Sequence, residues 1–275
     1  MKQLPDDTKQ ELSLQLRSVL RTNESSNPAS AVPENRALSY QFKGGTSFVG
    51  GFKSHLLGDN DLSELLFAEV IPNARMGVAE NTVSHDNSFQ YALFCYALLL
   101  GYEEQTDESA AVILVLDIIK DIRFGAPPEF FLLLARLWRG ETDAAIQMLD
   151  GIEKLENKKS EFYIQPGLST LVRGVVNNEP NSIKEGANLL LEKHLHTTKY
   201  FRTALESNHY YCEPVTLLNI VGRKLGVDVK ANIGDTTAVL KTKTFSPIDR
   251  PEIPAKKKFE VPVDLVPPCF LKKRG

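Results

Sequence analysis

The chain has few cysteines, no long apolar run and no recognisable targeting segment. Its three cysteines, Cys95, Cys212 and Cys269, are odd in number and far apart, so they fit neither a disulfide framework nor a zinc knuckle. The longest apolar runs, near residues 92–100 and 110–116, fall short of the ~18 residues that a membrane-spanning helix needs. Residues 1–7 lack the apolar core of a signal peptide. These features together predict a soluble protein of the reducing cytoplasm.

The one glycine cluster does not match a phosphate-binding loop. Residues 44–54 read GGTSFVGGFKS, but the P-loop needs a lysine directly after its second glycine, so that the ammonium reaches phosphates cradled by the preceding amides. Here Phe52 separates Gly51 from Lys53, and no strand pattern precedes the cluster. Residues 41–58 carry five glycines without helical periodicity, and the pattern favours a long flexible loop.

No group of nucleophile, base or metal-ligand residues has the spacing that its chemistry requires. His194 and His196 are two apart, so on a helix they point to nearly opposite faces and cannot share one ion. Cys212 follows His209 closely, but sequence proximity provides neither an oriented base nor an oxyanion site, and packing at a helix start is the better interpretation. We therefore predict no catalytic residue, no metal and no cofactor, with an enzyme of unfamiliar type as the weakest alternative.

The charge is unevenly distributed along the chain. Residues 241–275 hold nine basic and four acidic side chains, a balance of 9 − 4 = +5, and the net charge of −3 leaves −8 for residues 1–240. A general nucleic-acid binder has a basic footprint, so the acidic body argues against one. An acidic body suits a basic protein partner, although many proteins are acidic simply to remain soluble.

Apolar residues at helical spacing predict an all-α fold. Stripes recur from Leu12 to Leu20 and then through most of residues 61–225, separated by short turn segments such as Gly140 and Gly226. Short connections favour antiparallel helical hairpins, stacked as an α/α bundle or a short repeat-like array. Leu134, Arg136 and Ile146 recur 37 residues later as Leu171, Arg173 and Ile183, a weak hint of a repeat.

The predicted organisation has two parts. Residues 1–240 form the helical domain, within which residues 23–58 are rich in loop signals. Six prolines exclude helices over most of residues 241–275, which we interpret as a basic, proline-rich extension that packs on the body or is partly flexible.

One acidic segment is a candidate for partner binding. Glu103, Glu104, Asp107 and Glu108 lie in a compact turn between two apolar helices. Complementary charge steers association, so this turn could meet a basic partner. The simpler interpretation is a solvated loop whose acids cap the following helix.

The stretch from Phe130 to about Lys230 resembles the immunity protein 49 family, found beside toxins of polymorphic and type VI secretion systems. The resemblance rests on residues 137–141 (LWRGE) leading into 144–146, on 189–194 (LLLEKH), and on 213–218 (EPVTLL) followed by 222–227 (GRKLGV). It covers a third to a half of the chain, and the residues are mostly packing and turn positions. It implies a mainly helical protein and carries over no contact residue.

Membership would imply a non-enzymatic protein that binds a cognate toxin in the cytoplasm and neutralises it by direct occlusion. An acidic inhibitor favours a basic toxin, such as a nuclease, as the partner, without direct contact to nucleic acid or membrane. The competing hypothesis is a helical-repeat adaptor or scaffold that recognises a peptide or protein in a groove. The neighbouring genes discriminate between the two hypotheses, because an immunity gene lies directly downstream of its toxin gene.

Overall fold

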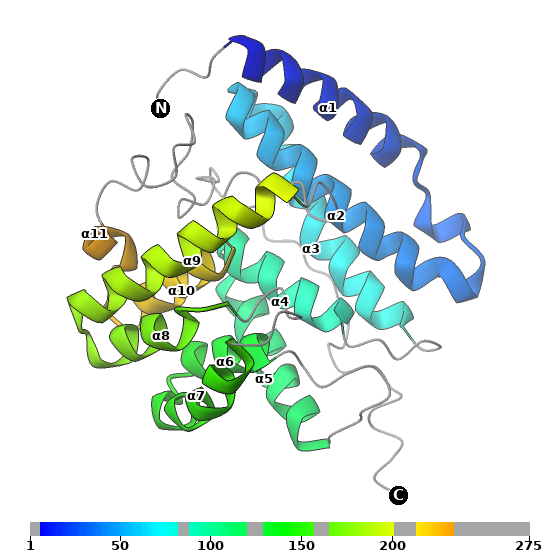
Figure 1. Ribbon diagram of the computed structural model, residues 1–275. Coiled ribbons are helices and arrows are strands. Elements are labelled where there is room, and N and C mark those ends of the chain that lie inside the picture. Colours follow the sequence, from blue (N-terminus) through cyan, green and yellow to red (C-terminus); the bar gives the residue numbers. More distant parts are fainter. Residues whose placement is uncertain (1–5, 82–87, 120–128, 157–164, 201–212, 234–275) are drawn as a thin grey trace, which may run out of the picture. The chain divides into compact units, whose positions relative to one another are not determined.

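The computed structural model describes residues 6–81, 88–119, 129–156, 165–200 and 213–233, and they contain helices and no strand. The described residues divide into two compact units, one made of residues 6–81 and 88–112 and the other of 113–119 and the later described ranges. The helices are α1 (Asp6–Ser25), the 3-10 turn η1 (Pro28–Ser30), α2 (Pro33–Leu57), α3 (Asn60–Glu80), α4 (Ser88–Leu100), α5 (Glu103–Ile119), α6 (Glu129–Trp138), α7 (Thr142–Glu156), α8 (Leu168–Asn177), α9 (Pro180–Tyr200), α10 (Glu213–Lys224) and α11 (Val229–Ile233) (Figure 1). The prediction of an all-α fold is confirmed.

Most of the helices predicted from periodicity form, and one predicted loop does not. The helices expected before Gly140 and Gly226 end there, as α6 and α10. Residues 41–58, expected to be a long loop, lie almost entirely in α2 instead, so the loop-rich segment 23–58 shrinks to a short connection around η1. The predicted C-terminal extension, residues 241–275, lies outside the described residues.

Close packing against neighbouring helices explains why glycines are tolerated in α2. A Cβ at Gly51 would lie 2.7 Å from the Phe67 ring on α3, and a Cβ at Gly50 would lie 3.2 Å from Val19 on α1. Glycine in a helix interior costs about 1 kcal/mol relative to alanine. The lost helix propensity is offset because the backbone of α2 approaches both neighbours where a side chain would keep them apart.

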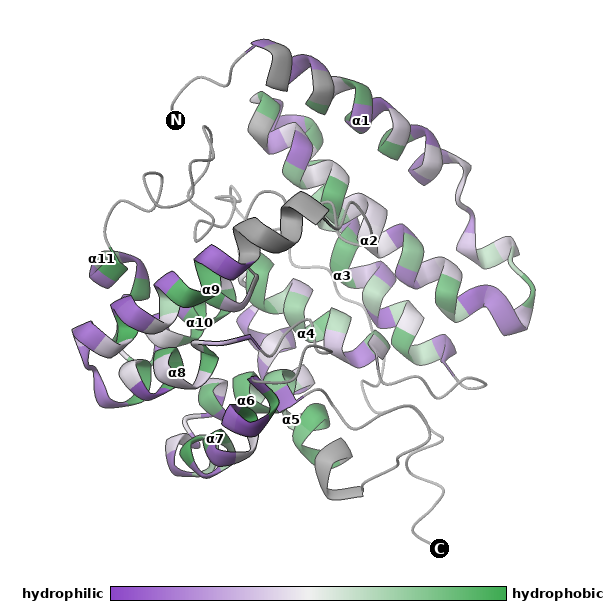
Figure 2. Cartoon of the chain, in the orientation of Figure 1, coloured by the Kyte–Doolittle hydropathy of each residue, from purple (hydrophilic) through white to green (hydrophobic). Residues whose placement is uncertain are grey.

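The α2–α3 pair forms the centre of the first unit. The Ser63 hydroxyl on α3 donates to the Gly51 carbonyl at 2.9 Å, and the rings of Phe48 and Phe67 lie with their centroids 6.0 Å apart. Tyr96 of α4 also packs against Phe48, at a ring distance of 5.0 Å. Most of α4 is apolar, as its green colour in Figure 2 shows, and it is buried over almost all of its length.

In the part of the chain that the structure describes, five helices end in the same way, with a residue in the left-handed conformation. The residue that follows donates its N–H to the carbonyl five positions back, which is the Schellman closure. The left-handed residues are Gly58, Gly101, Gly140, Asn178 and Gly226. The matching hydrogen bonds run from Asp59 to Ser54, Tyr102 to Ala97, Glu141 to Arg136, Glu179 to Gly174 and Val227 to Gly222, at 2.7–2.9 Å. Within the described residues, each closure is followed by a new helix within three residues, and short connections of this kind favour helical hairpins.

Two of these closures show how the hairpin α6–α7 aligns with the hairpin α8–α9. Gly140 and Asn178 are equivalent and lie 38 residues apart, one more than the spacing suggested by the three sequence matches. At 38, fully buried apolar positions coincide: Phe130 with Leu168, Leu133 with Leu171, Leu137 with Val175, Ala145 with Ile183, and Leu149 with Ala187. The 37-residue register is therefore wrong, because it pairs the buried Leu171 with Leu134, whereas the equivalent of Leu171 is Leu133.

Helices α6, α8 and α10, each the first helix of a hairpin, contribute to the core of the second unit. Along α6 every residue from Phe130 to Ala135 is buried, and α10 packs against both α6 and α8. Lys224 at the end of α10 places its ammonium 3.7 Å from the centre of the Trp138 ring, a cation–π contact. None of the described helices combines the length and apolar character that crossing a membrane requires.

Candidate functional site

The four predicted partner-binding residues lie on the first two turns of α5 rather than in a turn. The turn itself is made by Gly101 and Tyr102, and α5 begins at Glu103. Glu103 and Glu104 are exposed, where their carboxylates face the positive end of the helix dipole. Burial raises the pKa of the neighbouring Tyr102 phenol above its ordinary value, so that side chain is neutral beside the acids.

Glu108 has a charged partner on another helix. Its carboxylate lies 3.8 Å from the Arg75 guanidinium of α3, and Arg75 is buried while the Glu108 side chain is 41 % exposed. Asp107 is half-buried. The structure therefore leaves Glu103 and Glu104 as the two most accessible carboxylates of the predicted group.

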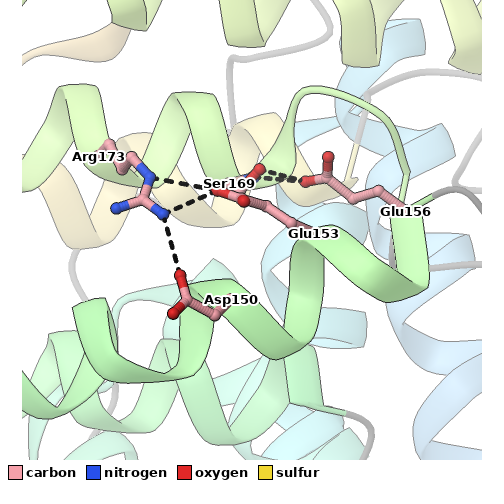
Figure 3. Close-up of polar contacts among 5 residues, drawn as sticks. All are labelled: Asp150, Glu153, Glu156, Ser169 and Arg173. Atoms are coloured by element: carbon pink, nitrogen blue, oxygen red, sulfur yellow. Dashed lines mark hydrogen bonds and ion pairs between the residues drawn. The ribbon is translucent and has the colours of Figure 1, made fainter.

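A second charged surface, which the sequence did not reveal, joins α7 to α8 (Figure 3). The Arg173 guanidinium on α8 donates to Glu153 Oε1 at 2.7 Å and lies 3.6 Å from Asp150 Oδ1, both acids being on α7. The hydrogen bond with Glu153 raises the pKa of Arg173 further above its ordinary value, so its charge is permanent. Asp150 is largely exposed, so this surface remains acidic toward solvent.

Glu156 performs a structural task on the same helix pair. The N-cap of α8 is Gly167, which has no side chain to bond the first free amides. Glu156 Oε1 accepts hydrogen bonds from both the backbone N–H and the hydroxyl of Ser169, each at 2.7 Å (Figure 3). A carboxylate in this place also complements the helix dipole, so Glu156 caps α8 from another helix.

This cap gives a direct prediction for single-residue variants. Glu156→Ala removes a charge-assisted acceptor from two donors, and we expect a loss of about 1.5–3 kcal/mol in unfolding free energy. Glu153→Ala, on the same helix, removes an exposed ion pair and should lose less than about 1 kcal/mol. Urea denaturation followed by circular dichroism measures both. Equal losses in the two variants would contradict the capping role of Glu156.

The other sequence candidates do not form a site among the described residues. The glycine cluster lies in α2, where helical hydrogen bonds engage the backbone amides that a phosphate would need, and Lys53 is fully buried. The side chains of His194 and His196, and residues 209–212, lie outside the described part of the chain. Within the described residues no three His, Cys, Asp or Glu side chains are grouped as metal ligands.

Comparison with known proteins adds no assignment. No protein-family model, no curated protein and no solved structure matches the chain. Neither the α5 carboxylates nor the α7–α8 surface can therefore be given a role by analogy, and both are interpreted from their chemistry alone.

Proposed function

We propose that this chain is a non-enzymatic binding protein that neutralises a cognate antibacterial toxin in the cytoplasm by direct occlusion. The observation that carries the proposal is the pair of exposed carboxylates, Glu103 and Glu104, that the tight closure at Gly101 and Tyr102 places at the start of α5. A rigid surface loses little conformational entropy on binding, and its charge favours a basic partner. The sequence resemblance to immunity proteins supplies the toxin as the partner.

Co-expression tests the proposal in cells. The product of the gene directly upstream should stop growth when expressed alone, and this chain should restore growth and co-purify with that product. A neighbour that is not toxic, or one whose toxicity this chain neither relieves nor binds, would rule out the immunity function.

Charge reversal on α5 tests where the toxin binds. In Glu103→Lys/Glu104→Lys we expect toxin affinity to fall at least ~10-fold, because two attractive contacts become repulsive. The matched control is Glu34→Lys/Asp61→Lys, which changes the net charge equally and reverses exposed first-turn acids of α2 and α3. Titration calorimetry should show the control binding within about twofold of the unmodified protein. Equal losses would mean that net charge, rather than the α5 surface, controls binding.

The alternative function is a helical-repeat adaptor or scaffold that binds a peptide or protein. The equivalent closures at Gly140 and Asn178 favour it, because repeated hairpins are how such proteins build extended binding surfaces. Growth rescue separates the two functions, since an adaptor would not protect cells from the neighbouring gene product.

A further inference from the structure

We draw no further inference here: the strongest candidate, the exposed apolar patch of Leu38 and Phe42 on the N-terminal half of α2, carries no proposal because nothing in the described part of the chain shows what covers it.

Discussion

Replacing Gly186 by alanine should destabilise the second unit by about 3 kcal/mol. A Cβ at this position of α9 would lie 2.3 Å from the backbone nitrogen of Leu171 and 2.7 Å from the carbonyl oxygen of Gly167. Both obstacles are backbone atoms of the α8 start, so no side-chain rotation relieves the clash and the helices must separate. The gain in helix propensity, about 1 kcal/mol, is smaller than this penalty.

Thermal unfolding followed by circular dichroism measures the effect. We expect a fall in Tm of roughly 6–12 °C for Gly186→Ala, given ~2–4 °C per kcal/mol in a unit of this size. Gly151→Ala on α7 is the control, because nothing lies within 4 Å of the added methyl group. That substitution should raise Tm slightly, through helix propensity alone. If Gly186→Ala unfolds at the temperature of the unmodified protein, α8 and α9 do not approach as closely as the structure shows.

Phe67→Ala should destabilise the first unit by about 3–5 kcal/mol. Its side chain is only 2 % exposed, packs on Phe48, and touches the surface of α2 at Gly51, where the absence of a Cβ makes room for the ring. Truncation leaves a cavity between α2 and α3 that Gly51, which has no side chain, cannot fill, so both the transfer free energy and the packing contacts are lost.

The control for this prediction is another phenylalanine of the same unit. Phe42 on α2 is 53 % exposed, and Phe42→Ala should lose less than about 1 kcal/mol. Urea unfolding curves of the two variants should have the same slope but well-separated midpoints. Similar midpoints would show that Phe67 is less deeply packed than described here.

The second unit was the more predictable from sequence. In α6 to α8 the apolar residues recur at helical spacing and the turns carry glycine or asparagine, so local signals and tertiary packing agree. The same positions show why the repeat register could not be read from identities. Leu134 and Leu171 match in type, yet the closures at Gly140 and Asn178 make Leu133 the equivalent of Leu171. Because positions 133 and 134 are both leucine, residue type alone could not show which of them corresponds to Leu171.

The candidate site was predictable only in part. The clustered acids were predicted to form a turn, but they lie on the first two turns of α5, a position that acids favour because of the helix dipole. The partner of Glu108, Arg75, lies 33 residues earlier and carries no local signal. The same is true of Arg173 and Glu153, which are brought together only by the packing of α8 on α7.

Helix α2 shows most clearly which features the local sequence determines and which depend on tertiary packing. The spacing of apolar residues and the left-handed turn residues are local properties, which is why periodicity and turn chemistry were sufficient to establish an all-helical chain of short-turn hairpins. Glycine has no such local preference for a helix, and its place in α2 depends on Val19 and Phe67, residues of other helices. The distances between helices exist only once the chain has packed, and the same is true of the pairing of Arg173 on α8 with Glu153 on α7.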